Sequence, residues 1–452
     1  MELLLENGAT DALFVGGCVR DHLLGKHEDI IDLDIEVYGL SYDRMLEILA
    51  PRFRVDLVGK SFGVIKVDQQ IDLSIPRTES KLGIGHKGFQ ILSNPNLTFD
   101  IAAARRDFTI NAIGMRLDGT LVDPYNGAED IQNKILRATS DAFGEDPLRV
   151  LRAMQFAGRF GFSLEDRTIA MCRDLKMEFA TLSAERIWGE WWKWAVKSKF
   201  PSQGLETLKQ TTWIDCFPQI ARLVGTPQHP DYHREKDVFE HCKLTVDAAA
   251  DIAGNNTLPE DERAVLLFAA LLHDVGKPDT LTKNPDGYWS SPGHAEAGTQ
   301  PARAFLEAML APHWLVDQVL PLIREHQTRM TADTQVASET FVRRLAVRLA
   351  PSNILMWAML CESDAKGCLC DREHQSLEPW VAIAQKLGVS EEPPKMIVQG
   401  RDLISLGVVP GPEMGRILQQ LFEAQLDGKF ENLEQGIALF QAEKDRHRRY
   451  EQ

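Results

Sequence analysis

The sequence predicts an α/β domain at the N terminus followed by a mostly α-helical remainder. Short β-rich runs bounded by turn residues occupy roughly the first 130 residues. From about Asp146 onward, apolar residues recur with helical spacing nearly to the end of the chain. The length of 452 residues suggests two to four domains, at roughly 100–200 residues per domain.

The composition is that of a globular protein with an acidic balance. Hydrophobic residues make up 44% and charged residues 26% of the chain, and the formal net charge is -16. This charge excludes a protein that coats nucleic acid indiscriminately, because such binding depends on a surplus of Lys and Arg. It leaves room for a local basic face, since residues 151–200 carry 9 Lys and Arg against 6 Asp and Glu. Ordinary solvated helix faces are the other interpretation of that stretch.

Cysteine usage and hydropathy indicate a cytoplasmic setting. The seven cysteines form no CxxC pair and no even framework, which is typical of a reducing compartment. No apolar run approaches the ~18 residues of a membrane span, so no membrane partner is expected. The first residues lack a basic segment, so we expect no secretory signal. Nothing in the sequence predicts a protein partner.

Several β-rich runs predict the strands of the N-terminal domain. Leu13–Val15 is apolar and ends at a Gly16-Gly17 pair, and Ile30–Val37 alternates with acidic residues on one face. Val64–Val67 and Ile71–Ile75 are two more β-rich runs. Acidic side chains therefore gather on one face of the predicted strands.

Asp32 and Asp34 are the first candidate catalytic residues. On a strand, side chains at i and i+2 share a face, and two carboxylates held together repel each other. Mg²⁺ relieves such repulsion and binds one or two carboxylates together with substrate phosphates. Asp72, on the later strand, could supply a third carboxylate. A solvated strand face is the other interpretation of this pair.

The turn after the first strand is a candidate phosphate site. Gly16 and Gly17 allow close approach of the backbone, and Asp21 follows Arg20 at the start of a predicted helix, whose N terminus favours anions. Arg20 offers a planar fork of donors to phosphate oxygens. A tight turn with an ordinary helix cap remains the alternative. Arg106, in RRDFTINA at 105–112, adds a further cation.

Asp146 and Arg149 present an acceptor and a donor at the start of a predicted helix. A carboxylate accepts from an exocyclic amine and an arginine donates to a ring nitrogen, an edge that cytosine and adenine offer and that uracil and guanine do not. A site built in this way can reject the wrong base by on the order of 10⁴–10⁵. The alternative is that Asp146 caps the helix before Pro147 and pairs with Arg149 at i+3.

A second cluster of possible metal ligands lies in the helical part. It consists of His241, His273-Asp274, His294, His326 and Asp364. Imidazole and carboxylate ligands from neighbouring helices suit divalent metals. A lone buried histidine is usually structural, but a contiguous His-Asp flanked by further ligands is seldom so.

These motifs together resemble the bacterial class II tRNA nucleotidyltransferase and poly(A) polymerase family. The resemblance rests on GGCVRD at 16–21, DLD at 32–34, RRDFTINA at 105–112, EDPLRVLR at 145–152 and AERIWGE at 184–190. It implies a polymerase-β-like head with a mixed sheet and helices, then a helical neck, an HD domain and a tail. The boundaries that we expect are 1–138, 139–228, 229–370 and 371–452.

The resemblance also implies roles for individual residues. Asp32, Asp34 and Asp72 would be the catalytic acids, and Asp32 and Asp34 would bind Mg²⁺. Residues of the head and neck would bind nucleotide: Gly16, Gly17, Arg20, Asp21, Arg106, Asp146, Arg149 and Arg152. Glu185 and Arg186 match a motif that braces the base-reading helix. Many relatives have Arg-Phe where this chain has Gln155-Phe156.

The helical cluster resembles the HD phosphohydrolase superfamily. That resemblance implies a divalent metal on four core ligands, with three further residues as substrate or second-metal ligands. The core ligands are His241, His273, Asp274 and Asp364, and the others are His294, His326 and Lys277.

The function that the resemblance implies is addition of C, C and A to the 3′ end of tRNA from CTP and ATP, releasing pyrophosphate. The HD domain would hydrolyse 2′,3′-cyclic or 2′-phosphates. A partial CC- or A-adding enzyme shares every motif. A poly(A) polymerase typically lacks the HD domain and has a basic tail, whereas residues 401–452 here carry a net charge of -2. From a different class, the chain could be mainly an HD phosphohydrolase.

Overall fold

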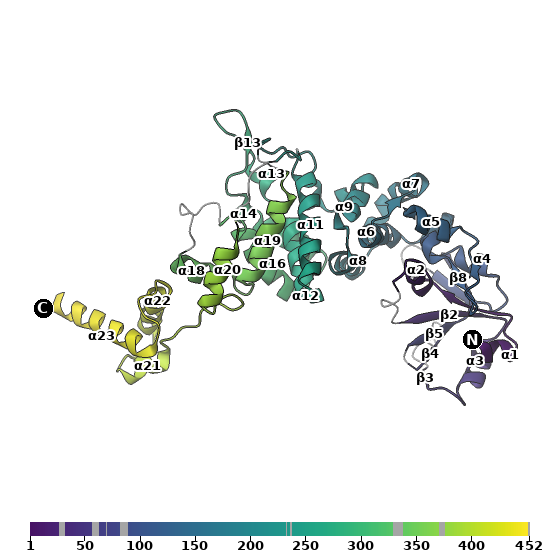
Figure 1. The fold of residues 1–452 in the computed structure, drawn as a ribbon, viewed down its shortest axis with the longest axis horizontal. Helices are drawn as coiled ribbons and strands as arrows, with labels where there is room; N and C mark the ends of the chain where they lie inside the picture. The colour runs from purple at the N-terminus through teal and green to yellow at the C-terminus, as the bar shows by residue number, and fades with distance from the viewer. Residues whose placement is uncertain are drawn as a thin grey trace. The chain divides into compact units, whose positions relative to one another are not determined.

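The computed structural model describes the chain in two compact units, Met1–Ala221 and Arg222–Gln452 (Figure 1). The described residues are 1–26, 32–56, 63–68, 70–81, 89–231, 233–235, 237–328, 338–369 and 376–450, with the side chains of 78–92 and 445–450 left out.

The N-terminal unit is built on a mixed sheet. Its seven strands run in the order β3-β4-β5-β2-β1-β8-β9, and β2 pairs with β5 in parallel while its pairing with β1 is antiparallel. The strands of this unit are β1 (Asp11–Val15), β2 (Leu33–Tyr38), β3 (Val55–Asp56), β4 (Val64–Val67), β5 (Ile71–Ser74), β6 (Arg77–Lys81), β7 (Phe89–Ser93), β8 (Gly114–Met115), β9 (Leu121–Val122), β10 (Ile135–Leu136) and β11 (Ser163–Leu164).

Helices pack on the sheet and continue beyond it. The helices of the unit are α1 (Glu2–Glu6), α2 (Gly17–Leu23), α3 (Tyr42–Leu49), α4 (Phe99–Ala103), η4 (Thr109–Asn111), α5 (Gly127–Asn133), η5 (Asp141–Glu145), α6 (Leu148–Phe160), α7 (Asp166–Asp174), η6 (Lys176–Thr181), α8 (Ala184–Lys197), α9 (Pro201–Gln210), η7 (Trp213–Cys216) and α10 (Pro218–Ala221). After α5, helices dominate the unit, and α6 packs against α8 and α9.

Alternation along β2 separates the core from the polar face. Ile35 and Val37 are buried in a cluster with Met45 of α3 and Leu4 of α1. Asp34, with the opposite parity, must point to the other face of the sheet. The strand that we predicted over 30–37 is confirmed from Leu33 onward, and residues 30 and 31 lie outside the described residues.

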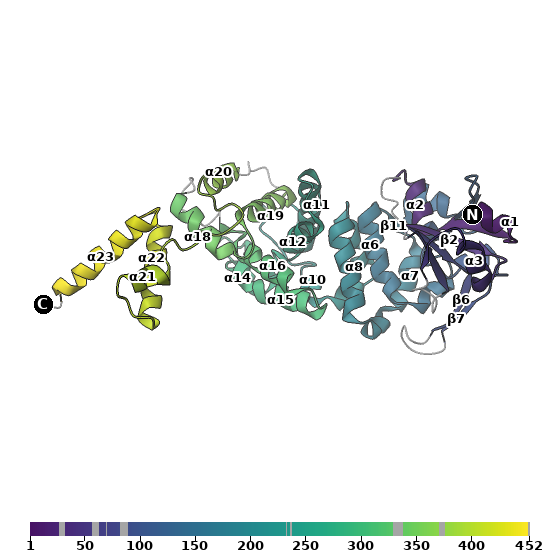
Figure 2. The same cartoon turned by 90° about the horizontal axis from the view of Figure 1, so that it is seen from below.

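The C-terminal unit is helical. Its core helices, α11, α12, α16 and α19, pack on one another (Figures 1 and 2). Its elements are α11 (Val238–Asn255), α12 (Glu260–Leu272), α13 (Lys277–Thr280), β12 (Thr282–Lys283), β13 (Trp289–Ser290), α14 (His294–Ala297), α15 (Thr299–Ala308), α16 (His313–Glu325), α18 (Glu339–Leu349), α19 (Ile354–Gly367), α20 (Glu378–Lys386), α21 (Gly400–Ser405), α22 (Pro412–Leu426) and α23 (Leu433–Tyr450).

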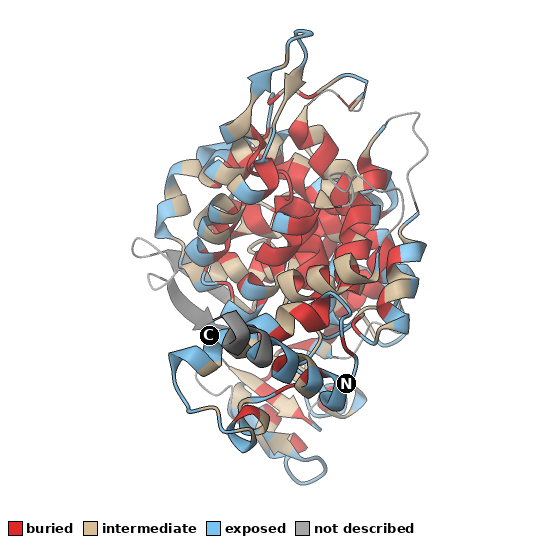
Figure 3. Ribbon diagram, turned by 90° about the vertical axis from the view of Figure 1, so that its left-hand side faces the viewer, coloured by how far each residue is buried: buried red, intermediate tan, exposed pale blue. Residues whose placement is uncertain are grey.

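The four core helices carry many of the buried residues of this unit. In α12, every residue from Ala264 to Leu272 is buried, whereas exposed residues predominate on the helix that ends at the C terminus (Figure 3). Among the described helices, none is long and apolar enough to cross a membrane. The predicted fold class, a mixed α/β head followed by a helical remainder, is confirmed.

Candidate functional site: a nucleotide pocket and a histidine cluster

Asp34 and Asp72 lie opposite each other on adjacent parallel strands. The register of β2 and β5 pairs the two residues, so their side chains leave the same face of the sheet from strands about 4.8 Å apart. Asp34 is exposed, but the protein around it removes part of the hydration of its carboxylate, and this desolvation raises its pKa. The negative charge of Asp72 raises that pKa further. This mutual repulsion is what a divalent cation would relieve.

Asp32 lies immediately before β2 and is exposed. Its charge also contributes to the raised pKa of Asp34. Asp72 is in addition ion-paired with Lys66, whose Nζ lies 2.9 Å from Oδ1. The three predicted acids thus influence one neighbourhood, and their catalytic roles stay predictions.

Asp34 and Asp72 open into a pocket of about 690 Å³ within the N-terminal unit. The opposite wall comes from α6 and α8. The predicted residues that line it are Gly16, Gly17, Arg20, Asp34, Asp72, Arg106, Asp146, Arg149, Arg152 and Arg186. The pocket therefore combines an acidic edge with several arginines.

Gly16 allows an arginine to approach the turn between β1 and α2. Its φ is +74°, and a Cβ at this position would lie 3.0 Å from Arg106 Nη1. Arg106 also reaches the carbonyl oxygen of Asn111 at 3.3 Å and Glu36 at 3.8 Å. A side chain at position 16 would strain the backbone and crowd this cation.

Arg20 is buried and held by two neighbours. Its Nε and Nη2 donate to the carboxylate of Asp21 at 2.9 and 2.8 Å, and its Nη1 donates to Asn111 Oδ1 at 2.7 Å. Only 5% of Arg20 is exposed, and it lines the pocket. Asp21 therefore orients the guanidinium, and the predicted contact of Asp21 with nucleotide stays a prediction.

Arg152 is anchored by a buried carboxylate. Its Nε and Nη2 lie 2.7 and 2.6 Å from Asp107 Oδ2, and Asn111 Nδ2 donates to the other oxygen at 2.8 Å. Burial acts to raise the pKa of Asp107, but Arg152 and the hydrogen bonds outweigh it and lower that pKa. The pair holds one wall of the pocket in place.

Asp146 and Arg149 are fixed by different partners at the start of α6. Asp146 Oδ1 accepts from the backbone N–H of Leu148 at 3.1 Å, and Oδ2 accepts from Arg186 of α8 at 2.8 Å. Arg149 donates to the carbonyl oxygens of Ala142 and Arg105 at 2.5 and 2.6 Å. Helix capping and bracing by Arg186 are thus both present.

The second group of predicted residues meets in the C-terminal unit. His241 is near the start of α11, His273 and Asp274 follow α12, and Asp364 is near the end of α19. His294 begins α14 and His326 follows α16. The four histidines and Asp274 are buried.

Three of the histidines are oriented by their own backbone. The Nδ1 atoms of His273, His294 and His326 lie 2.8, 2.7 and 2.6 Å from carbonyl oxygens three residues earlier. A carbonyl only accepts, so each Nδ1 is the donor and each Nε2 presents a lone pair. The Nε2 atoms of His241 and His273, and those of His294 and His326, lie 3.3 Å apart.

Asp274 joins the two histidine pairs. Its Oδ2 lies 3.2 Å from His273 Nε2, and its Oδ1 lies 3.1 Å from His294 Nε2. Asp364 Oδ1 completes the first group, 3.0 Å from His241 Nε2.

The imidazole nitrogens and carboxylate oxygens that converge here repel one another unless a proton or a cation lies between them. Burial acts to lower the pKa of His241, but Asp364 and a second carboxylate, Glu235, raise it to about 9. Imidazole nitrogens and carboxylates within this reach of one another suit a divalent transition metal. The residues present therefore fit a metal at the predicted core positions, and its identity stays open to measurement.

Lys277 is tied to the cluster and to a residue that sequence reasoning missed. Its Nζ lies 2.6 Å from Asp274 Oδ2 and donates to Gln228 Oε1 at 2.6 Å. This bond fixes the amide orientation, leaving Gln228 Nε2 buried and without a hydrogen-bond partner among the described residues. The predicted phosphate contact of Lys277 stays a prediction.

Close packing of α11 on α19 brings His241 to Asp364. Gly367 lies against Thr245, and a Cβ on Gly367 would overlap Thr245 Oγ1. Glycine at this position sets the short distance between the two helices.

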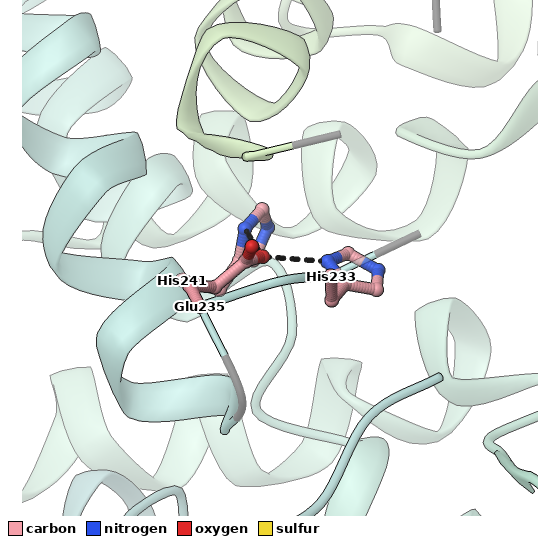
Figure 4. A group of neighbouring side chains, drawn as sticks. All are labelled: His233, Glu235 and His241. Carbon is pink, nitrogen blue, oxygen red and sulfur yellow. Dashed lines mark hydrogen bonds and ion pairs between the residues drawn. The ribbon is translucent and has the colours of Figure 1, made fainter. Parts of the chain in front are cut away.

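Sequence reasoning also missed other residues of the two sites. Asp107 and Asn111 stand within the quoted RRDFTINA motif, but only its second arginine received a role. His233 and Glu235 lie in the loop before α11, and Glu235 contacts His241 of that helix (Figure 4). Their signal was weak, because a His and a Glu in a loop have no periodicity to distinguish them.

Two family matches agree with the two sites. Residues 12–137 match the family described as Poly A polymerase head domain, and residues 238–358 match the HD domain. The multifunctional CCA protein of Aromatoleum aromaticum is 38% identical over 381 residues, which cover 81% of this chain and 88% of that protein. The chain belongs to the multifunctional CCA protein family.

Other members of the multifunctional CCA protein family agree. The protein of that name from Hahella chejuensis is 33% identical and covers 87% of this chain and 91% of its own length. Solved CCA-adding enzymes share the fold. The Bacillus stearothermophilus enzyme in complex with CTP gives a TM-score of 0.66 at 21% identity, covering 100% of this chain and 97% of that one. The Thermotoga maritima enzyme complexed with tRNA gives 0.57 at 17% identity, with 97% and 92% covered.

Proposed function

We propose that this protein adds C, C and A to the 3′ end of tRNA from CTP and ATP and releases pyrophosphate. The observation that carries the proposal is a single pocket with the Asp34–Asp72 pair on one edge and Asp146, Arg149 and Arg186 on another. Curated relatives are named multifunctional CCA proteins, and related solved enzymes hold CTP or tRNA. The predicted partners, CTP, ATP and the tRNA 3′ end, fit this pocket.

The base is read by polarity at the start of α6. Asp146 accepts from the exocyclic amine of cytosine or adenine, and Arg149 donates to the adjacent ring nitrogen. Arg186 holds Asp146 in position for this contact. Uracil and guanine present a carbonyl beside an N–H, which leaves buried polar groups unpaired and is rejected.

The triphosphate lies between the glycine turn and the acids. Arg20 and Arg106 offer donors to phosphate oxygens, and Arg152 adds charge from α6. Asp32 and Asp34, with Asp72 beside them, would hold Mg²⁺, which when bound neutralises charge on the phosphates. The tRNA 3′-hydroxyl attacks the α-phosphorus, its proton is lost, and the bond to pyrophosphate breaks.

The C-terminal unit would be a metal-dependent phosphohydrolase acting on 2′,3′-cyclic or 2′-phosphates. His241, His273, Asp274 and Asp364 would hold the divalent metal, and Lys277 would neutralise a phosphate oxygen. We also propose that the protein is cytoplasmic and that its domains end at residues 138, 228 and 370. The HD match to residues 238–358 supports the placement of the third part.

The decisive experiment supplies tRNA transcripts that lack one, two or three terminal nucleotides, with CTP and ATP separately and together. We expect completion of all three transcripts and then termination. Asp34→Ala should abolish incorporation, with His273→Ala, in the other unit, as the matched control. Normal incorporation by Asp34→Ala would overturn the catalytic assignment.

The same assay decides among the alternatives. A partial adder would stop after CC or would accept only the transcript that lacks A. A poly(A) polymerase would extend unstructured RNA with many adenylates. A protein that is mainly a hydrolase would add water across one P–O bond of a 2′,3′-cyclic-phosphate end, leaving a phosphomonoester, without incorporating nucleotide.

A further inference from the structure

A third carboxylate, besides Asp274 and Asp364, contacts the histidine cluster from outside. Glu235 lies in the loop before α11, between the rings of His233 and His241 (Figure 4). Its Oε1 is 2.7 Å from His233 Nδ1 and 3.0 Å from His241 Nδ1. These three residues could in principle form a metal site of their own or a hydrogen-bonded chain.

The two nitrogens of His241 decide between these possibilities. Its Nε2 faces Asp364 and His273, at 3.0 and 3.3 Å, inside the cluster. Its Nδ1 faces Glu235 on the opposite side of the ring. A neutral imidazole has one lone pair and one N–H. When a metal takes the Nε2 lone pair of His241, the remaining N–H is at Nδ1 and is donated to Glu235.

His241 differs from the other three histidines in this respect. His273, His294 and His326 rest on backbone carbonyls of their own segments. At His241 a charged carboxylate takes the main contact, and the nearest carbonyl, that of Gly367, is farther away at 3.3 Å. A carboxylate accepts more strongly than a carbonyl and makes the opposite nitrogen a more basic ligand.

Glu235 is itself held firmly. Its side chain is 1% exposed, its Oε2 accepts from the backbone N–H of Leu369 at 3.2 Å, and His233 contacts Oε1. Leu369 lies just after α19, the helix that supplies Asp364. The contact therefore ties the loop before α11 to the end of α19, around the ligand pair.

We propose that Glu235 is the positioning residue for His241, fixing its tautomer and strengthening its Nε2 as a metal ligand, and that His233 anchors Glu235. The inference rests on the proposed metal site of the HD unit. It assigns no second metal to the His233–Glu235–His241 group.

The test is titration of the full-length protein with Co²⁺, followed by visible absorption, with metal counted at saturation. Glu235→Ala should weaken binding about 10- to 100-fold and alter the spectrum, with the metal count unchanged. Glu235→Gln, which keeps an acceptor without its charge, should fall between Glu235→Ala and the unaltered protein. His233→Phe should have the smallest effect.

Nucleotide incorporation into tRNA, which belongs to the other unit, shows that the N-terminal unit of the same preparations is intact, and the melting temperature reports on the substituted unit. Unchanged affinity and spectrum, with only a lower melting temperature, would overturn the inference and leave Glu235 a structural residue. Loss of one bound metal in both the Glu235→Ala and His233→Phe proteins would overturn it in favour of a separate metal site. If the unaltered protein binds no Co²⁺, the proposed HD metal site and the inference are both overturned. If binding is weakened in His273→Ala but normal in Glu235→Ala, the inference alone is overturned.

Discussion

Arg186 of α8 donates to Asp146 over 2.8 Å and so links α8 to the segment just before α6. Both side chains are about a quarter exposed, at 27% and 26%, so the pair is neither fully solvated nor sealed. The contact leaves Asp146 with free acceptor capacity while preventing it from rotating away.

Removing this brace should loosen base selection. In Arg186→Gln we expect discrimination of CTP and ATP against UTP and GTP to fall on the order of tenfold, because a hydrogen bond to a charged group contributes about 1.5–3 kcal/mol. Single-nucleotide incorporation with each of the four triphosphates measures it. Arg167→Gln, which removes an exposed ion pair with Asp141, is the control, and equal selectivity in both variants would contradict the role of Arg186.

Asp34→Asn should inactivate nucleotide addition and yet slightly stabilise the metal-free protein. The pKa of Asp34 is raised in the fold, so its ionised form costs stability above that pKa, and the cost disappears below the ordinary carboxyl pKa. We expect a rise in melting temperature of up to roughly 2–4 °C at neutral pH, vanishing near pH 3. Added Mg²⁺ should stabilise the unaltered protein more than the variant. A destabilised variant at neutral pH would refute the repulsion.

Asp107→Asn should destabilise the N-terminal unit, because Arg152 would lose its buried partner. The expected loss is on the order of 2 kcal/mol, below that of a fully buried pair because Arg152 is 32% exposed. Since the pKa of Asp107 is lowered, its stabilisation is present above the ordinary carboxyl pKa and is lost as pH falls toward the folded-state pKa. Thermal unfolding across pH, with the exposed Asp141→Asn as control, checks both points, and an equal effect of the two substitutions would contradict the anchor.

His326→Ala should remove one metal ion per chain and leave another in place. The two oxygens of Asp274 face different histidines, His273 on one side and His294 with His326 on the other. We therefore expect the second group to hold its own ion. Metal analysis after equilibration with a divalent metal measures the count. An unchanged count with weaker phosphohydrolase activity would instead assign His326 to substrate.

The sequence predicted the fold class and many of the charged residues that line the pocket because these signals are local. Strand alternation placed Asp34 on the polar face, and the glycine pair marked the turn beside Arg20. The juxtaposition of Asp34 with Asp72 was less accessible, because it depends on β5 pairing in parallel with β2 after β3 and β4 have intervened. Such long-range pairing leaves no periodic trace in the sequence.

The same limit applied to the supporting residues. His273 and Asp274 are adjacent in the sequence and can be recognised there as possible ligands. Glu235 can be recognised only from its contact with His241, where it fixes the tautomer of the ring. Asp107 is a similar case, since its value lies in its contact with Arg152, 45 residues away. Ligands can be suggested by residue type, but the groups that orient them become visible only with distances.

The packing of Gly367 against Thr245 has a consequence for synthesis of the chain. His241 and Asp364 are 123 residues apart, so the histidine cluster cannot assemble until α19 has left the ribosome and docked on α11. The nucleotide pocket, whose lining ends at Lys197, can form far earlier, since N-terminal domains generally fold first during translation. A nascent chain halted in α16 would thus already have the pocket of the N-terminal unit, and only the later helices would complete the histidine cluster.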